Sequence, residues 1–339
     1  MSTGKFLIIA LLLMLGCAGL LSCGRVSNPV VPEHTAISSK TDCVYQGAFL
    51  GEDTITAAKI EDFEAMSGKK LDIVLKFLAF NTMGSSGGFP LAEAEVVSDK
   101  GAVLFIKLEP WSWAGADDDS FSLEKIIAGN FDEMLTNFAR DAGNYDKSLF
   151  VSFGHEMNAD WYPWADKPEL YKEAYVHVHD LMSNYAGKIT WVWDPNIDCD
   201  DISKYYPGND YVDWIAVDGY NTQDYGASWK SAQQLFDTTI DDIASYGKPT
   251  MIGETACDAN DENDETVRKP QWLYLAVEWI TGKKKIGSSD NLIKGYVYFN
   301  FDKVEDGQLK NWEISRSEAK AQYKQALTDY SSFFKGITP

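Results

Sequence analysis

Two glutamates occupy positions in the sequence that suit acid–base and nucleophilic chemistry. Glu156 comes shortly after the apolar run Leu149–Phe153, and Glu254 closes a second apolar run. A carboxyl group beside a buried strand is costly unless it is paired or used. Cleavage of a glycosidic bond needs two such groups, one protonated to release the leaving oxygen and one ionised to act at the anomeric carbon. Trp161 and Trp164 follow Glu156 and supply rings that raise a carboxyl pKa by desolvation or stack on sugars.

The elements that must position these residues recur in a strand–helix rhythm. Short apolar or β-branched runs predict strands at Val44–Leu50, Leu71–Phe77, Ala102–Leu108, Leu149–Phe153, Ile189–Trp193, Val212–Val217, Thr250–Ile252 and Gly295–Phe299. Amphipathic stretches predict helices at Ile55–Met66, Leu123–Ala139, Leu170–Tyr185, Ser228–Ser245, Gln271–Thr281 and Glu318–Phe333. Eight strands with intervening helices predict a (β/α)8 barrel, formed by a single catalytic domain over residues 43–336. A doubly wound open sheet is the alternative, although no GxGxxG motif follows the first strand.

The segments at the ends of the predicted strands resemble those of glycoside hydrolase family 26. They read LEPW at 108–111, GHEMNADWYPW at 154–164, WVWDPN at 191–196, YYPGNDYVDWIAVDGYN at 205–221 and KPTMIGET at 248–255. That family contains endo-β-mannanases and mixed-linkage β-1,3-1,4-glucanases on (β/α)8 barrels. The resemblance therefore implies a hydrolase with a polysaccharide substrate, either mixed-linkage β-glucan or β-mannan.

The same resemblance implies roles for individual residues. Glu156 would be the acid/base and Glu254 the nucleophile of a retaining double displacement. Tyr220 would donate a hydrogen bond to Glu254, and His155 would bind substrate or organise the carboxylate pair. The other expected substrate contacts are Trp161, Glu109, Trp111, Trp164 and Tyr298. Neither a metal nor an organic cofactor is implied, because two carboxyl groups suffice for the reaction.

Three positions depart from the family pattern, one of which is Ala159 in place of a glycine that is common in the motif. Ser152 stands where relatives usually carry an arginine, three residues before the histidine. Without that charge, either the balance of the two carboxyl pKa values changes or another part of the chain supplies the cation. Tyr298 stands where many relatives have a tryptophan, which predicts a weaker stacking platform.

The N-terminal segment predicts export. Residues 1–22 combine Lys5 with a ten-residue apolar run and small residues, which is typical of a signal peptide. The sequence Leu-Leu-Ser-Cys-Gly around Cys23 resembles a bacterial lipobox, so we expect lipid attachment at Cys23 and a linker over residues 23–42. The protein would then be a lipoprotein of the cell envelope, at the outer membrane or cell surface, held to the membrane through this lipid alone. Ordinary signal cleavage with an unmodified cysteine is the alternative.

Composition excludes some partners and leaves others open. A formal net charge of −21 argues against nucleic acid, whose phosphates need clustered lysine and arginine. We expect a monomer. The odd set Cys43, Cys199 and Cys257 leaves at least one thiol without an intramolecular partner. The acidic run 258–265 is either a solvated loop or a calcium-binding one, although it lacks the glycine of an EF-hand loop.

A second class of function stays open on the sequence alone. Ser152 and the expected lipid tether favour a catalytically weak polysaccharide-binding lipoprotein linked to exopolysaccharide. The two glutamates favour an enzyme, because a binding protein gains nothing from a carboxylate pair. Among enzymes, the LEPW and WYPW segments resemble the glucanases at least as closely as the mannanases.

Overall fold

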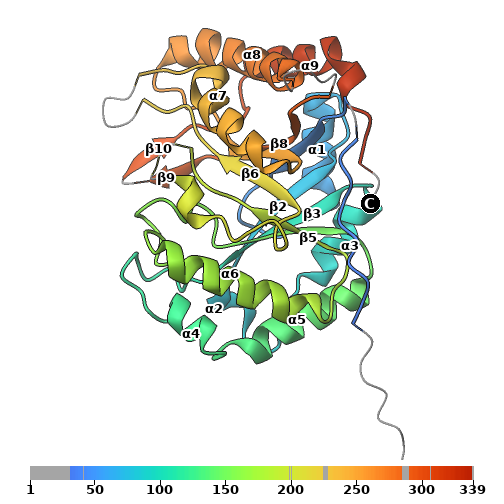
Figure 1. Cartoon of the computed structure of the whole chain (residues 1–339). Coiled ribbons are helices and arrows are strands. Elements are labelled where there is room, and N and C mark those ends of the chain that lie inside the picture. Colours follow the sequence, from blue (N-terminus) through green and yellow to red (C-terminus); the bar gives the residue numbers. More distant parts are fainter. Residues whose placement is uncertain are drawn as a thin grey trace, which may run out of the picture. The chain divides into compact units, whose positions relative to one another are not determined.

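The computed structural model describes residues 31–337 apart from positions 41, 198, 200, 224–227, 285–289 and 306. Its main sheet is a closed barrel in which eight parallel strands pair in chain order, and β8 closes onto β1 (Figure 1). The strands are β1 Tyr45–Phe49, β2 Ile73–Ala79, β3 Val103–Glu109, β4 Leu149–Phe153, β5 Ile189–Trp193, β6 Trp214–Asp218, β7 Thr250–Thr255 and β8 Ile293–Phe299. The prediction of a (β/α)8 barrel is confirmed, and the open-sheet alternative is wrong.

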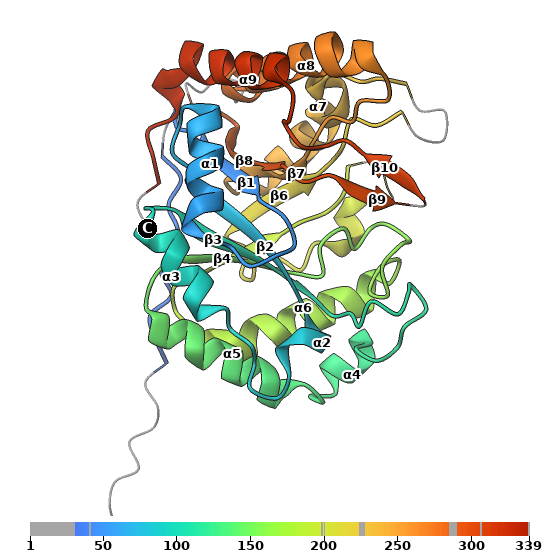
Figure 2. The same ribbon diagram turned by 180° about the vertical axis from the view of Figure 1, so that it is seen from behind.

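Helices surround the barrel, and several lie side by side, such as α5 with α6 and α8 with α9 (Figures 1 and 2). The α-helices are α1 Ala57–Ser67, α2 Phe80–Met83, α3 Leu91–Asp99, α4 Leu123–Ile127, α5 Asp132–Tyr145, α6 Pro168–Ser183, α7 Ala232–Ile243, α8 Lys269–Gly282 and α9 Ser317–Asp329. An antiparallel hairpin of β9 (Lys303–Glu305) and β10 (Gln308–Lys310) follows β8. The single helix predicted over 123–139 is wrong, because the chain turns at Gly129 with φ of 82° and forms α4 and α5 instead.

Parallel strands covered on both faces explain the nearly continuous apolar runs of the sequence. Every residue of β1, β3, β4 and β5 is buried. On β5 the rings of Trp191 and Trp193 face outward. The ring centroid of Trp191 lies 6.1 Å from that of Tyr175 on α6, and the ring centroid of Trp193 lies 5.0 Å from that of Tyr206. These two tryptophans therefore join the barrel to its outer layer and leave the interior to other side chains.

The segment before β1 packs against the barrel. The backbone N–H of Ile37 donates to Thr190 Oγ1 at 2.8 Å, and Trp214 Nε1 donates to the Ile37 carbonyl at 2.8 Å. The described folded unit begins at Val31, so residues 31–40 belong to it and are not part of a free linker as predicted. The expected signal peptide and Cys23 lie outside the described residues. Within residues 31–337, no described helix is both long and apolar enough to cross a membrane.

The three cysteines of the folded unit, Cys43, Cys199 and Cys257, form no disulfide among the described residues. Cys43 and Cys257 are buried, whereas Cys199 is partly exposed. Burial raises the pKa of the Cys43 thiol and leaves it protonated. Cys43 and Cys257 therefore act as small packing groups in the described structure.

Candidate active site

The predicted chemical residues converge at the carboxyl ends of the barrel strands, which is where barrels of this architecture build their sites. Glu109 ends β3 and Glu254 lies in β7, while His155 and Glu156 follow β4 directly. All four side chains are buried. The barrel thus brings together residues that are up to 145 positions apart in the chain.

Glu156 lies in a tight turn and is held by neutral donors. Its backbone has φ of 52°, in the left-handed region that non-glycine residues seldom adopt. Its N–H donates to the Asp194 carbonyl at 2.7 Å. Asn196 Nδ2 donates to Oε1 at 2.8 Å and Trp161 Nε1 donates to Oε2 at 2.8 Å. Backbone and side chain are therefore both fixed in this strained turn, as is common where strain serves function.

The surroundings of Glu156 favour its protonated form. Burial, followed by the charge of Glu254, raises the pKa of Glu156 to about 7. The hydrogen bonds from Asn196 and Trp161 and the charge of Lys107 reduce this rise without abolishing it. A carboxyl group with a pKa near neutrality is suited to donate a proton in one step and accept one in the next.

Asn196 was not predicted as a site residue, although it lies in the WVWDPN segment after β5. It is fixed by a reciprocal pair with Asn158, whose Nδ2 donates to the Asn196 carbonyl at 2.8 Å. In return, the Asn196 N–H donates to Asn158 Oδ1 at 2.9 Å. The Asn196 amide is thereby oriented so that its NH2 group points at Glu156.

Glu254 is held by a cation and a phenol. Lys107 Nζ lies 2.5 Å from Oε1, and the Tyr220 hydroxyl donates to Oε2. Burial alone would raise the pKa of Glu254, but the Lys107 charge and these hydrogen bonds hold it below its ordinary value. The predicted bond from Tyr220 is present in the structure, and the pKa of Glu254 lies below its ordinary value whereas that of Glu156 lies above it.

Lys107 is a central residue of the site that sequence analysis missed. It is fully buried on β3 and forms ion pairs with Glu254 at 2.5 Å, Asp194 at 2.7 Å and Asp218 at 2.7 Å. Although burial opposes its charge, these carboxylates raise the pKa of Lys107 well above its ordinary value. The signal was present in the sequence as the one cation in the run VLFIKLE, since a lone charge in a buried strand needs partners.

The cation that position 152 lacks comes from the neighbouring strand. Ser152 on β4 is the register partner of Lys107 on β3, so the two Cα atoms lie side by side at the same level of the barrel. Of the two alternatives stated for Ser152, the structure therefore favours a cation supplied from elsewhere. The lysine reaches the carboxylates that an arginine at 152 would be placed to meet.

The cluster leaves no room for a larger residue at Gly253. A methyl group there would lie 2.5 Å from Asp218 Oδ1 and 2.6 Å from Asp194 Oδ1. Burial, followed by the charge of Asp194, raises the pKa of Asp218 well above its ordinary value. One buried cation thus faces three buried carboxyl groups, and burial and mutual repulsion oppose the ionisation of all three at once.

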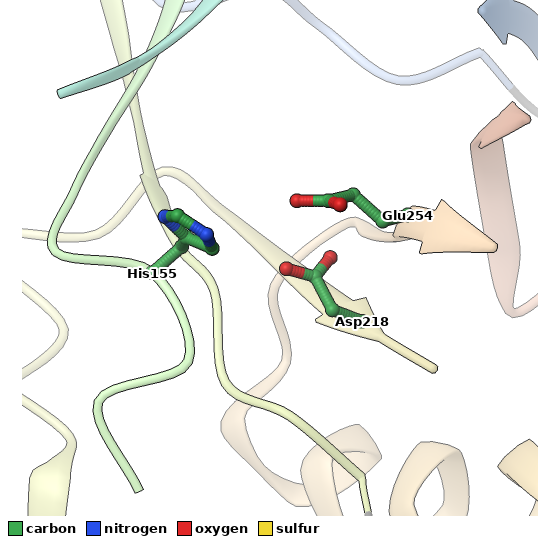
Figure 3. A group of neighbouring side chains, drawn as sticks. All are labelled: His155, Asp218 and Glu254. Carbon is green, nitrogen blue, oxygen red and sulfur yellow. The ribbon is translucent and has the colours of Figure 1, made fainter. Parts of the chain in front are cut away.

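His155, Asp218 and Glu254 present ligand-type atoms within 4.8 Å of one another (Figure 3). The ammonium group of Lys107 contacts both carboxylates of this group, so it supplies the positive charge that they need. Burial lowers the pKa of His155 to about 3, which leaves the imidazole neutral. Its Nε2 lies 3.2 Å from the Tyr162 hydroxyl. A neutral, fixed ring beside Glu254 can hydrogen-bond a sugar hydroxyl without adding charge.

A cleft of about 340 Å³ opens beside Glu254. Glu109 and Trp111 line it, as predicted, together with Tyr162 and the unpredicted Trp113. Burial, followed by the charge of Glu254, raises the pKa of Glu109 to about 8. Glu109 is therefore a neutral hydrogen-bonding group at the wall of the cleft near neutral pH.

Two of the predicted substrate contacts, Trp164 and Tyr298, are buried and do not line this cleft. Trp164 is buried, stacks on Tyr162 at 4.4 Å and donates from Nε1 to the His155 carbonyl, so it supports the turn without lining the cleft. Tyr298 is also buried, and its hydroxyl donates to the Trp312 carbonyl at 2.8 Å. Its ring lies 6.1 Å from that of Tyr323 on α9, on the outer side of the barrel. In contrast, the Trp161 ring is 44% exposed and available to a ligand.

The acidic run 258–265 was interpreted as either a solvated loop or a calcium-binding loop. In the structure it is only partly solvated, because two of its acids are buried. Asp258 is buried, and its Oδ1 accepts from the N–H groups of Ala259 at 2.8 Å and Asn311 at 2.9 Å. Asp264 is buried as well and pairs with Arg268 at 2.7 Å. These acids fix the loop after β7 to neighbouring segments.

Comparison with known proteins shows which families of sequence and fold the chain resembles. Residues 125–258, which include both glutamates, match the profile of Glycosyl hydrolase family 26. Endoglucanase H of Acetivibrio thermocellus is 33% identical over 304 residues, which cover 84% of this chain and 30% of that protein. A mannan endo-1,4-beta-mannosidase of Bacillus subtilis is 30% identical over 117 residues, or 31% of this chain and 30% of that protein. The chain thus spans about a third of the length of these relatives.

Solved structures share the fold at lower identity. The catalytic domain of the GH26 endo-beta-1,4-mannanase of Bacillus sp. JAMB-750 superposes with a TM-score of 0.64 at 17% identity, covering 87% of this chain and 88% of that one. A Bacillus subtilis mannanase superposes with a TM-score of 0.61 at 16% identity, covering 88% and 91%. The profile match spans both glutamates and one relative aligns along most of the folded unit, and these similarities support placing the chain in glycosyl hydrolase family 26.

Proposed function

We propose that the protein is a retaining endo-β-glycanase that hydrolyses β-1,4-type bonds within a polysaccharide. In the first step Glu156 gives its proton to the leaving oxygen, while Glu254 attacks the anomeric carbon and forms a glycosyl ester. In the second step Glu156 takes a proton from water, whose oxygen attacks the same carbon and releases the Glu254 carboxylate. The new hemiacetal keeps the β configuration.

One observation carries the proposal: the two buried glutamates have opposite hydrogen-bonding and charge surroundings, which push their pKa values apart. Neutral donors surround Glu156, whose pKa is raised to about 7, whereas the cation Lys107 contacts Glu254 and lowers its pKa. A double displacement needs this division between an acid and an ionised nucleophile. A protein that only binds polysaccharide would not need it, so the binding-only alternative is the weaker one.

We propose β-glucan, rather than mannan, as the preferred polymer. The relative named Endoglucanase H aligns over 84% of this chain, whereas the mannosidase of Bacillus subtilis aligns over 31%. A mixed-linkage glucan is the natural first substrate to test, because the LEPW and WYPW segments also resemble the glucanase branch of the family. Mannan and galactomannan are the comparison polymers.

The test measures the reducing ends released from mixed-linkage β-glucan, β-mannan and galactomannan. NMR then identifies which anomer of the new reducing end forms first. We expect release from the mixed-linkage glucan, with the β-anomer formed first. Glu254→Ala should abolish release, and Glu156→Gln should lower the rate by about 10²- to 10⁴-fold.

Glu133→Gln, at an exposed acid of α5, is the matched control and should keep full activity. Initial formation of α product would contradict the retaining mechanism. Release from mannan alone would contradict the proposed substrate. No release from any polymer by folded protein would contradict the enzyme assignment.

We further propose that the enzyme is a bacterial envelope lipoprotein anchored through Cys23. The support is the lipobox-like sequence around Cys23 that follows the apolar run. In a bacterial host, the chain should incorporate a labelled fatty acid and sediment with membranes. Cys23→Ser should lose both properties, whereas Cys17→Ser should keep them; the reverse result would move the anchor to Cys17.

A further inference from the structure

The loop after β3 carries an aromatic side chain that no part of the proposed mechanism uses. Trp113 lines the cleft that also contains Glu254, and its side chain is 60% exposed. Large exposed aromatic rings at the mouth of a cleft are characteristic of sites that bind flat ligand faces. The ring is therefore available to a ligand already positioned over Glu254.

The backbone of Trp113 is held in an unfavourable conformation. Its φ of 62° lies in the left-handed region, where a bulky residue is a genuine outlier. Such strain persists only when surrounding contacts impose it, and it clusters at binding and catalytic sites. Glycine would satisfy this backbone without cost, so the tryptophan at this place has a reason other than stability.

Hydrogen bonds within the loop impose this conformation. The Asp118 carboxylate accepts from the N–H and hydroxyl groups of Ser112 and from the N–H of Ser120 at 3.0 Å. These bonds lower the pKa of Asp118 to about 2. Asn81 Nδ2 donates to the Ser112 carbonyl at 3.0 Å and ties the loop to α2. Asp118 thus organises the residues on either side of Trp113.

The indole is also tied to the wall of the cleft. The Trp113 side chain hydrogen-bonds the Glu109 carboxyl group, and as a donor-only side chain it gives its N–H. Glu109 is buried and lines the same cleft. The ring and the carboxyl group therefore form one unit, with an apolar face next to a polar group that can bind hydroxyls.

The position of the cleft defines which part of a substrate it receives. It contains the nucleophile Glu254, whereas Trp161, which is bonded to the acid/base, is absent from its lining. The acid protonates the leaving group, so the opposite side receives the sugars that become attached to the enzyme. Acids outnumber cations in the lining, which disfavours negatively charged sugars.

We propose that Trp113 is the stacking platform of a glycone-side subsite for a neutral β-linked glycan, and that Glu109 hydrogen-bonds the hydroxyl groups of the same sugar. This subsite rests on the proposed function, because the division into two sides follows from the roles of Glu156 and Glu254. Each glycan that fills the cleft far enough to reach Trp113 gains affinity from its ring.

The test measures binding of β-glucan oligosaccharides of increasing length by calorimetry, in a Glu254→Ala background that prevents hydrolysis. Adding Trp113→Gly should weaken binding of the longer oligosaccharides by about 10- to 100-fold. The shortest ligands should bind unchanged. Trp113→Phe, which keeps a ring but loses the N–H, should fall between. Leu275→Ala, at an exposed apolar residue of α8 outside the cleft, is the control and should bind normally.

Thermal unfolding separates a platform from a structural residue. Trp113→Gly should unfold at the same or a higher temperature, because glycine relieves the positive φ. A lower unfolding temperature with equal loss for every ligand length would overturn the proposal. So would unchanged binding of long oligosaccharides while the unmodified protein hydrolyses glucan, a result that leaves the proposed function intact.

Discussion

The two glutamates of the proposed mechanism are similarly buried but are held in different ways, and the contrast explains how one site can contain both a proton donor and an ionised carboxylate. Glu156 lies in a turn after β4 and accepts hydrogen bonds from an amide and an indole. Glu254 lies within β7 and contacts a buried ammonium group and a phenol. Burial raises the pKa of either carboxyl group. At Glu254 the charge of Lys107, together with the hydrogen bonds from Lys107 and Tyr220, reverses that rise.

The location of each glutamate fits its task. Glu254 is fixed by strand pairing and by a cation that also contacts Asp194 and Asp218, so its carboxylate has a rigid surrounding. Glu156 depends on a strained turn, whose N–H is satisfied by the Asp194 carbonyl. Asp194 thus connects the surroundings of the two glutamates. Its side chain pairs with Lys107, and its carbonyl oxygen accepts a hydrogen bond from the Glu156 N–H. Charge therefore distinguishes the two glutamates, while geometry connects them.

The largest effect should come from removing the cation. Lys107→Met leaves buried carboxyl groups without their partner, which costs stability on the order of 3–5 kcal/mol. The pKa of Glu254 should rise, so the acid limb of the pH–rate profile should move to higher pH. We expect the rate at neutral pH to fall by about 10²- to 10³-fold. The measurements are pH–rate profiles and thermal unfolding.

Two further variants sharpen this prediction. Lys283→Met removes a lysine that pairs with Asp237 and Asp241 on the outer face, and it should leave the pH profile unchanged. Adding Ser152→Lys to Lys107→Met returns a cation from the register partner on β4 and should recover part of the activity. An unshifted acid limb in Lys107→Met would show that this lysine does not control the ionisation of Glu254.

A smaller effect is expected from the phenol. Tyr220→Phe removes the hydroxyl that donates to Glu254 Oε2 and keeps the ring, which stacks on Trp312 at 4.6 Å. A hydrogen bond to an ionised group favours the ionised form. Loss of this hydrogen bond should move the acid limb of the pH–rate profile to higher pH. At pH values on that limb, the rate should fall by about tenfold. A shift of the alkaline limb in place of the acid limb would contradict the assignment of Tyr220 to the nucleophile.

The smallest effect should come from the indole of Trp161, which donates a hydrogen bond to Glu156. Trp161→Phe keeps an aromatic wall but removes the donor to Glu156 Oε2. Because that bond lowers the pKa of Glu156, its loss should raise the pKa, and the acid should stay protonated to higher pH. The alkaline limb should then move upward while the rate changes by about two- to threefold. A shift of the alkaline limb to lower pH would contradict the role of this hydrogen bond.

The sequence predicted those parts of the molecule that depend on local pattern. Alternating apolar runs and amphipathic stretches predicted the barrel, because parallel strands covered on both faces and helices covered on one leave distinct periods. Glu156 and Glu254 were found because a carboxyl group at the end of a buried strand is unusual. Local pattern did not distinguish one helix from the pair α4 and α5, because a single turn at Gly129 decides this.

Residues that act through distant partners were not predicted. Lys107 looks like an isolated cation until β3 is placed across the barrel from β6 and β7. Asn196 meets Glu156 because β4 and β5 are neighbours. Trp164 and Tyr298 were assigned to the substrate because their motifs are near the site, but side-chain direction, which the fold decides, places them elsewhere. Trp113 passed unnoticed because only its backbone conformation and exposure distinguish it.

The sequence by itself determined the barrel, the two carboxyl groups and the departure at Ser152, since each follows from residue types at fixed places in the chain. Tertiary structure alone decided which carboxyl group keeps its proton. That outcome depends on which donors approach each oxygen, and those donors come from strands far apart in the chain. A pKa is a property of the surroundings of a group, so it is fixed only when the barrel closes.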